Sequence, residues 1–213
     1  MTIPDPPSTV VFDLGNVLVG WDPRGPFAGV AERAEVDEFF REVDFPAFNR
    51  LQDAGRPWAE ARREVAQRLP HRAWLVDRYV SHFALALTGP VPGTEHVLRA
   101  LGRSGTRLLG LTNFSAETYH HAPVAAPAIG LLEAVVVSGR EGVAKPDREI
   151  YDLLIERFRL DPPRTVFVDD SPANVAAARA AGLIGLHFTD SEGLVRDLVA
   201  LGVGGVEHLL PAP

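Results

Sequence analysis

Acidic and polar residues follow three short apolar runs of the chain. Asp13 ends the run VVFD, Thr112 and Asn113 end RLLGLTN, and Asp169 and Asp170 end TVFVDD. Carboxylates that lie close together repel one another and hold protons unless a cation lies among them. Mg²⁺ is the natural cation for hard oxygen ligands of this kind. If the three runs end in one crevice, the sequence predicts a Mg²⁺ site there.

One basic residue suits the same crevice. Lys145 lies in EGVAKPD, directly before Pro146 and a following helical pattern. A lysine beside an anion-binding site provides a point charge for phosphate. The residue types together therefore indicate a bound cation beside a phosphate-binding group.

Four apolar runs that precede or accompany these residues are predicted to be strands. Each run is too short to carry a helical stripe of its own and suits a strand that is buried on both faces. The four runs are residues 10–13, 107–113, 134–138 and 165–170.

Helical patterns separate the runs. In REIYDLLIERF the apolar residues Ile150, Leu154 and Phe158 recur at every fourth position, and SPANVAAARAAG offers Ser171 as N-cap and Gly182 just beyond the helix. This alternation predicts an α/β fold, with a Rossmann-like parallel sheet core flanked by helices. In an open parallel sheet ligands bind beyond the carboxyl ends of the strands, so the acidic residues can converge there.

The segment between residues 21 and 88 breaks the alternation. RPWAEARREVAQRLP and RAWLVDRYVSHF both carry apolar residues at helical spacing, and no strand pattern is found between them. We therefore expect a helical cap domain at 21–88, inserted after the first strand of a core domain formed by 1–20 and 89–213. Gly20 and the GPVPG segment at 89–93 are expected to be linkers or hinges.

The composition excludes several kinds of partner and site. The chain has 213 residues, of which 46% are hydrophobic, enough for a packed core. Its formal net charge is −7 with scattered basic residues, so no nucleic-acid partner is expected, and the absence of cysteine excludes disulfides and thiolate chemistry. No run approaches the ~20 apolar residues that span a bilayer, and no secretory pattern is found. We expect a cytoplasmic protein that acts on a small molecule and has no membrane partner.

Four segments together resemble a known family. FDLGNVLV, LTNFS, VAKPD and FVDDSPANV, in this order and spacing, resemble the four motifs of the haloacid dehalogenase superfamily of hydrolases. The resemblance spans residues 13–174, and residues 21–87 lie where that family inserts a helical cap. The DLGN form resembles the branch that includes sugar-1-phosphate phosphatases. The resemblance implies a Mg²⁺-dependent phosphatase of small phosphate monoesters, with sugar or anomeric phosphates among the candidates.

The same resemblance implies a role for each motif residue. Asp13 would be the nucleophile that forms an aspartyl phosphate. Mg²⁺ would be held by the Asp13 carboxylate, the Gly15 backbone carbonyl and Asp170, with Asp169 touching it directly or through water.

Further residues would support the phosphate group. The Thr112 hydroxyl and the Asn113 backbone N–H would bind phosphate oxygens, and Lys145 would offset the carboxylates. Asn174 would play a supporting part, and Ser171 would cap the following helix.

The sequence departs from the family pattern at Gly15. Most phosphatases of this superfamily place a second aspartate there as general acid and base, which is worth ~10² to 10⁴ in rate. Its absence favours leaving groups that need little protonation, or requires a substitute, for which Asp22 is the candidate. The cap residues Asn49, Arg50 and Asp53 either face the crevice or lie in solvent.

Two other functions remain open from the sequence. The 2-haloacid dehalogenases of the superfamily also lack that aspartate and need no metal, although such chemistry has no use for the pair Asp169 and Asp170. The second is a non-catalytic ligand-binding relative, which Gly15 would equally suit.

Overall fold

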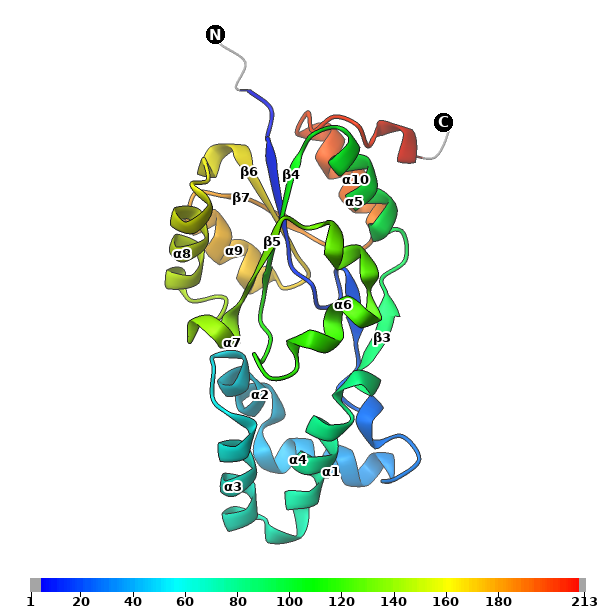
Figure 1. Cartoon of the computed structure of the whole chain (residues 1–213), viewed down its shortest axis with the longest axis vertical. Coiled ribbons are helices and arrows are strands. Elements are labelled where there is room, and N and C mark those ends of the chain that lie inside the picture. Colours follow the sequence, from blue (N-terminus) through cyan, green and yellow to red (C-terminus); the bar gives the residue numbers. More distant parts are fainter. Residues whose placement is uncertain (1–4, 211–213) are drawn as a thin grey trace.

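A five-stranded parallel sheet forms the centre of the part of the chain that the computed structural model describes, residues 5–210. Its spatial order is β5–β4–β1–β6–β7 (Figure 1). The strands are β5 (Ala134–Val137), β4 (Arg107–Thr112), β1 (Thr9–Phe12), β6 (Thr165–Asp169) and β7 (Ile184–His187). The Rossmann-like α/β fold expected from the sequence is confirmed. β7 is an additional edge strand that its short pattern, IGLH, does not predict.

The strand register brings the chemically important residues to one edge of the sheet. Phe12 of β1 pairs with Val168 of β6 on one side and with Gly110 of β4 on the other. The Asp13 N–H then donates to the Val168 carbonyl at 2.8 Å. Because all the strands are parallel, the residues that follow them emerge at the same edge.

Two pairs of helices cover the faces of the sheet (Figure 1). The helices α5 (Thr94–Arg103) and α10 (Ser191–Ala200) pack with Val10 and Phe12 in one apolar cluster. The helices α8 (Arg148–Phe158) and α9 (Pro172–Ala180) pack with Val11 in the other. Alternate residues of β1 therefore enter opposite halves of the core, as expected of a strand buried on both faces.

Several further helical elements are short. Two are one-turn helices, α6 (Ala122–Ala125) and α7 (Ser138–Glu141). The others are 3₁₀ turns at Gly25–Phe27, Pro70–Arg72, Phe83–Ala86, Tyr119–His121, Pro127–Leu131, Pro162–Arg164 and Glu207–Leu209. Among residues 5–210, no helix combines the length and apolar character needed to cross a membrane.

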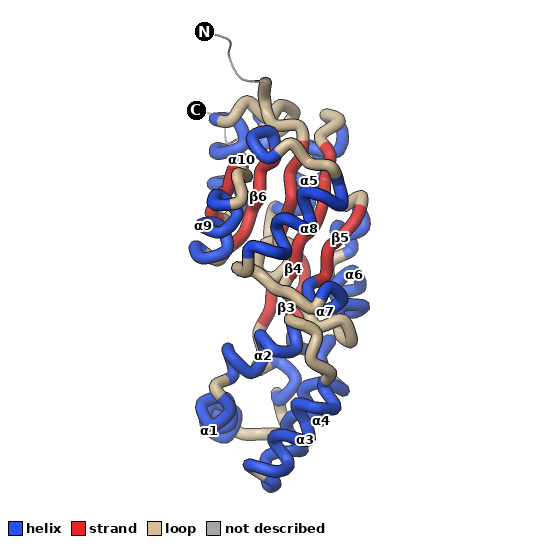
Figure 2. The backbone as a smooth tube through the Cα atoms, turned by 90° about the vertical axis from the view of Figure 1, so that its left-hand side faces the viewer, coloured by secondary structure: helices blue, strands red, loops and turns tan. Residues whose placement is uncertain are grey.

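Four helices between β2 (Val19–Trp21) and β3 (Leu87–Pro90) lie apart from the sheet (Figure 2). They are α1 (Arg33–Val43), α2 (Phe45–Asp53), α3 (Trp58–Arg68) and α4 (Ala73–Ser81). Buried aromatic rings fill the space between them; for example, Phe40 and Phe45 stack with ring centroids 4.0 Å apart. The helical character expected for this segment is observed, while its division from the core as a separate domain, with boundaries at 20/21 and 88/89, stays a prediction.

The two chain crossings between the helices and the sheet, which were expected to be linkers or hinges, are paired with each other. β2 (Val19–Trp21) and β3 (Leu87–Pro90) form an antiparallel ribbon in which Gly20 pairs with Gly89. A Cβ atom on Gly20 would lie 2.2 Å from the Thr88 hydroxyl, so glycine permits the strands to approach. Pro90 is tolerated because the ribbon has only edge strands.

The loops that follow β4 and β5 are joined by backbone contacts. The Phe114 N–H donates to the Ser138 hydroxyl at 2.9 Å, and the Gly139 N–H donates to the Phe114 carbonyl at 3.1 Å. A Cβ atom on Gly139 would lie 2.5 Å from the Ala116 backbone nitrogen. Because backbone atoms cannot move aside cheaply, this close approach requires glycine.

Substitution of this glycine tests the close approach. We expect Gly139→Ala to lower the free energy of unfolding by about 2 kcal/mol, because the added methyl group overpacks the joined loops. Gly130→Ala is the matched control, since no atom lies within 4 Å of a Cβ atom there. Urea unfolding midpoints measure both changes, and equal midpoints for the two variants would contradict the assignment.

Candidate active site

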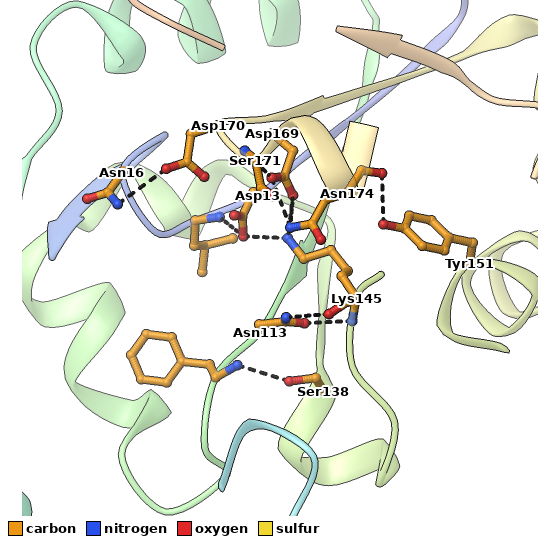
Figure 3. Close-up of polar contacts among 12 residues, drawn as sticks. Asp13, Asn16, Asn113, Ser138, Lys145, Tyr151, Asp169, Asp170, Ser171 and Asn174 are labelled. Carbon is orange, nitrogen blue, oxygen red and sulfur yellow. Dashed lines mark hydrogen bonds and ion pairs between the residues drawn. The ribbon is translucent and has the colours of Figure 1, made fainter. Parts of the chain in front are cut away.

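Three carboxylates and one ammonium group meet at the carboxyl edge of the sheet (Figure 3). Asp13 follows β1, Asp169 ends β6, and Asp170 is the next residue. One oxygen from each carboxylate lies within 4.8 Å of the other two. The structure thus brings together four of the residues that the sequence pattern assigned to one crevice.

Lys145 is the only lysine of the chain, and its side chain lies between two of the carboxylates. Its Nζ atom is 2.9 Å from Asp13 Oδ1 and 2.6 Å from Asp169 Oδ2, and the residue is 1% exposed. Burial lowers the pKa of the ammonium group, but the charges of Asp13 and Asp169 outweigh burial and raise it above the ordinary lysine value. Lys145 is therefore charged at neutral pH.

The Lys145 backbone is held from two sides. The Asn113 side chain exchanges two hydrogen bonds with it, from Nδ2 to the Lys145 carbonyl and from the Lys145 N–H to Oδ1, each 2.8 Å long. Arg50 of α2 donates to the same carbonyl at 2.7 Å and to Asp147 at 2.7 Å. The Asn113 side chain thus positions Lys145, a contact that the sequence did not indicate.

The Asp13 carboxylate has one engaged and one open oxygen. Oδ1 accepts hydrogen bonds from the Leu14 N–H at 2.7 Å and from Lys145, while Oδ2 accepts none within residues 5–210. Burial raises the pKa of Asp13 to about 7 although the Lys145 charge lowers it, and Asp169 raises it further. The open oxygen lies on a buried carboxyl that needs a positive charge nearby to stay ionised at neutral pH.

The two neighbouring aspartates differ in how they are held. Asp169 is 0% exposed, and its oxygens accept from Lys145, from the Ser171 N–H at 2.8 Å and from the Asn174 amide at 3.0 Å. Asp170 is half-buried and accepts one hydrogen bond of 3.3 Å from Asn16. Burial raises the pKa of Asp170. Asp170 is therefore the freer of the two to bind a cation.

The charges of the cluster suit a divalent cation. Three carboxylates against one ammonium group leave two negative charges in a largely buried site. A divalent cation would neutralise them, and Mg²⁺ prefers carboxylate oxygens. The donor set and its charge therefore fit Mg²⁺. An isolated acidic pair or an exposed acidic cluster would not require such a cation.

The other expected site residues occupy different positions. Gly15 lies beside the cluster, and Thr112 is buried at the end of β4, where its side chain is not among the residues that line the cavity described below. Ser171 is the N-cap residue directly before α9, as expected, but its side chain makes no capping hydrogen bond. Its N–H instead binds Asp169, whose carboxylate lies at the start of the helix.

A cavity of about 250 Å³ separates the acidic cluster from the helical segment. Asp13 and Asp170 line it from the sheet, and Asn49 and Asp53 line it from α2. Its apolar lining, for which we call it the aromatic cavity, comprises Val19, Trp21, Trp58, Tyr79, Phe83, Leu87 and Phe114. Trp21 thus stacks on Phe45 and also lines the cavity.

The sequence did not decide which polar residues of the helical segment face the crevice, and the structure does. Asp53 and Asn49 face the aromatic cavity, whereas the Arg50 guanidinium binds the Lys145 loop. Asp22, expected as a substitute acid, is exposed, accepts the Arg24 N–H at 2.9 Å and does not line the cavity.

Sequence reasoning missed some supporting residues. Asn16 has a φ of 54° and links Asp170 to the Trp21 N–H, and the Tyr151 hydroxyl donates to the Asn174 carbonyl at 3.0 Å. An asparagine after glycine is a signal for the left-handed conformation that places Asn16. No comparable sequence signal marks Tyr151, which lies on a different helix from Asn174.

Comparisons with known proteins agree with this geometry. A family model described as haloacid dehalogenase-like hydrolase matches residues 7–182. A sesquiterpene phosphatase from Aspergillus oryzae is 36% identical over 95 residues, which are 45% of this chain and 48% of the fungal protein. The chain therefore spans about half the length of that relative.

Two further similarities extend over most of the chain. A phosphoglycolate phosphatase from Rhodospirillum rubrum is 27% identical over 92% of this chain and 86% of its own. The structure of a HAD-family enzyme from Bacteroides thetaiotaomicron, in complex with magnesium and inorganic phosphate, superposes with a TM-score of 0.68. It is 20% identical and covers 87% of this chain and 96% of its own, which shows a common fold.

Removal of the single lysine tests the electrostatics of the cluster. We expect Lys145→Met to lower the free energy of unfolding in EDTA by about 3 kcal/mol, because it leaves two buried carboxylates without a counter-charge. Without Lys145 the pKa of the Asp13 carboxyl rises further above its unfolded value. Stability is then lost as the pH rises from the unfolded pKa towards the folded one, so the loss should be larger at pH 8 than at pH 5.

Two variants control this experiment. Lys145→Met with Asp169→Asn should recover part of the stability, because one uncompensated carboxylate is removed. Lys145→Arg should fail to recover it fully, because the planar guanidinium does not fit the place of a compact ammonium group. Chemical unfolding at both pH values provides the measurement, and a pH-independent loss for Lys145→Met would contradict the electrostatic explanation.

Proposed function

Because the chain belongs to the haloacid dehalogenase-like hydrolases, we propose that it is a Mg²⁺-dependent phosphatase that hydrolyses small phosphate monoesters through a phosphorylated Asp13. The observation that carries this proposal is the buried cluster of Asp13, Asp169 and Asp170, with Lys145 between two of them. A site of this charge provides both a cation site and an oxygen nucleophile for phosphoryl transfer.

The proposed metal ligands follow from how the carboxylates are held. Asp13, Asp170 and the Gly15 carbonyl would hold Mg²⁺, and Asp169 would act directly or through water because its oxygens already accept hydrogen bonds. Bound Mg²⁺ supplies charge neutralisation on the phosphoryl oxygens. Lys145 keeps Asp13 ionised and oriented, with Oδ1 engaged and Oδ2 free to react.

The proposed reaction has two chemical steps, both at Asp13. Asp13 Oδ2 forms a bond to phosphorus while the bond from phosphorus to the leaving oxygen breaks, and that oxygen receives a proton. Water then attacks the phosphorus of the aspartyl phosphate, and inorganic phosphate leaves as the Asp13 carboxylate reforms. The Thr112 hydroxyl and the Asn113 N–H would bind phosphate oxygens during both steps.

The comparisons support the phosphatase class. Two relatives are named phosphatases, and the similar fold from Bacteroides was solved with magnesium and phosphate. The sugar-1-phosphate branch that the DLGN form suggests stays a prediction, as does a cytoplasmic location. A small phosphorylated molecule is the partner that this class implies.

The alternatives have less support. A metal-independent dehalogenase has no need for the negative cluster, which is costly to bury without a cation. A non-catalytic binding protein would have no need for a buried carboxylate with one oxygen open toward a cavity, as Asp13 has.

Activity with and without metal tests the proposal. Acetyl phosphate and p-nitrophenyl phosphate should be hydrolysed with Mg²⁺ and not in excess EDTA. Asp13→Asn should lose turnover by at least ~10³-fold because the amide is a far weaker nucleophile than a carboxylate. Mass spectrometry of an acid-quenched reaction should find phosphate on Asp13.

An exposed aspartate supplies the control. Asp152→Asn on α8, where Asp152 pairs only with Arg148, should retain wild-type turnover. Turnover that persists in EDTA, or a phosphorylated chain in Asp13→Asn, would refute the proposal.

A further inference from the structure

The aromatic cavity is walled by rings that contact one another from the helical segment to the sheet. Trp58 lies 5.3 Å from Tyr79, Tyr79 5.6 Å from Phe83, and Phe83 5.5 Å from Phe114, measured between ring centroids. The first three rings come from the helical segment, and Phe114 follows β4. Any leaving group attached to a phosphate at Asp13 would therefore contact an apolar wall.

Most polar side chains in the lining already have partners within the protein. Asn49 donates to Asp53 at 2.9 Å, and Asn113 is hydrogen-bonded to the Lys145 backbone. Ser115 accepts the Glu117 N–H at 3.3 Å. A sugar in this cavity would leave several hydroxyl groups without partners, and each unpaired group costs binding free energy.

Three lining residues do have unpartnered polar atoms. Trp58 Nε1, the Tyr79 hydroxyl and Thr118 Oγ1 are buried and have no hydrogen-bond partner within residues 5–210, and the three residues are 3%, 2% and 2% exposed. They provide an N–H donor and two hydroxyl groups for up to three polar atoms of a ligand. A mainly apolar cavity with a few placed polar groups is the usual form of a small-molecule site.

The charge of the lining limits the substrate further. No lysine, arginine or histidine is found among the described residues that line the aromatic cavity. A second phosphate or a carboxylate on the leaving group would therefore have no counter-charge. The volume of about 250 Å³ lies below the ~300 Å³ at which pockets for drug-sized ligands begin, so the ligand is small.

We propose that the substrate is a phosphate monoester of a mainly hydrocarbon alcohol, with the size of one ring or a short branched chain. Its hydrocarbon part occupies the aromatic cavity, and it carries at most three further polar atoms and no second charge. This inference rests on the proposed phosphatase activity, and it replaces a sugar with a hydrocarbon group as the leaving group.

Aromatic rings also bind quaternary ammonium groups, so a cationic alcohol is the competing substrate. The carboxyl that would pair with such a cation is Asp53, which faces the cavity. Burial raises the pKa of Asp53 to about 7. A carboxyl that is readily protonated is a poor permanent counter-ion, which favours the neutral substrate.

A substrate series on the wild-type protein tests the proposal. With acetyl phosphate as the reference, kcat/KM for n-alkyl phosphates should rise by about fourfold for each methylene group that enters the cavity, and then level off. 3,3-Dimethylbutyl phosphate should exceed phosphocholine, its cationic counterpart of similar shape, by at least ~10-fold. Phe83→Leu should move the optimum to a longer chain because it widens the cavity.

The outcomes separate this inference from the proposed function. Absence of acetyl phosphate hydrolysis would refute the phosphatase activity itself. Hydrolysis of acetyl phosphate with a flat alkyl series, or with glucose 1-phosphate or phosphocholine preferred over the hydrocarbon esters, would refute the hydrocarbon substrate alone.

A second inference rests on the position of α2. Arg50 fixes this helix to the core through the Lys145 carbonyl and Asp147. Asp53 lies three residues later, on the same side of the helix, and lines the aromatic cavity. Within the described residues, it is the only carboxyl that lines the cavity from the helical segment.

Asp53 has the surroundings of a group that can hold a proton. Its carboxyl is half-buried and accepts a hydrogen bond from Asn49. Burial and the nearby charge of Asp13 raise its pKa to about 7, against the charges of Lys145 and Arg50, which lower it. Gly15 offers no side chain, and Asp22 does not line the cavity.

We infer that Asp53 donates the proton that the leaving-group oxygen takes up as its bond to phosphorus breaks. Asp53 becomes a carboxylate in that step, and it accepts a proton from the water that attacks the aspartyl phosphate in the next step. This role also rests on the proposed phosphatase activity, but it does not depend on the hydrocarbon character of the leaving group.

Leaving groups of different acidity test this role. In Asp53→Asn, kcat/KM for ethyl phosphate should fall by ~10² more than kcat/KM for acetyl phosphate, whose leaving group needs little protonation. Asp22→Asn is the control and should match the wild type on both esters. In the wild type the ratio of ethyl to acetyl phosphate turnover should fall as the pH rises through about 7, and this fall should be weaker in Asp53→Asn, where only the ionisation of the esters themselves contributes.

Use of the ratio removes effects that both substrates share, such as metal binding and the ionisation of Asp13. Equal losses on both esters in Asp53→Asn would show a structural role and refute the inference. So would a ratio that does not depend on pH in the wild type, or one whose pH dependence is the same in Asp53→Asn as in the wild type.

Discussion

The Lys145 ammonium group lies between two buried carboxylates, and the rest of the site is arranged to keep it there. A charge in this position is costly unless its partners are close and oriented, because water is excluded from the site. Strand β1 delivers Asp13, strand β6 delivers Asp169, and the Asn113 amide fixes the lysine backbone. The register of β1 with β6 therefore determines whether the charges balance. A shift of one residue would separate the carboxylates from the lysine and leave the three charges uncompensated by one another.

The sheet and the helical segment contribute different properties to the same cavity. The sheet edge supplies negative charge and an open carboxylate oxygen, while the helices supply aromatic rings and the carboxyl of Asp53. Arg50 connects the two parts, since it donates to the carbonyl of the very lysine that balances the acidic cluster. The paired strands β2 and β3 provide the second connection. The position of Asp53 relative to Asp13 thus depends on contacts at both ends of the helical segment.

Much of the core was predictable because its signals are local. The runs around Asp13, Thr112 and Asp169 are apolar and short, and each proved to be a buried parallel strand. The helices at 148–158 and 172–180 followed from spacing and from Pro172 at a helix start. The ribbon of β2 and β3 was not predictable, because its strands lie almost seventy residues apart and contain glycine and proline, which usually indicate loops. The sequence also did not show that the Ser171 side chain makes no capping hydrogen bond. The Asp169 carboxylate, which Lys145 holds in place, accepts the Ser171 N–H instead.

The sequence by itself indicated which residues could take part in the chemistry, because four ordered motifs restrict the family. It also determined that the usual second carboxylate is missing, since Gly15 has no side chain. Only the tertiary structure decided what surrounds the reacting group. Trp58, Tyr79, Phe83 and Asp53 reach the cavity through the packing of helices whose sequence patterns show which faces are apolar but not which residues meet across space. Helical periodicity reports burial, whereas the identity of a residue's neighbours depends on how the elements pack, and this is why the sequence did not show that Asp53 rather than Asp22 lines the cavity.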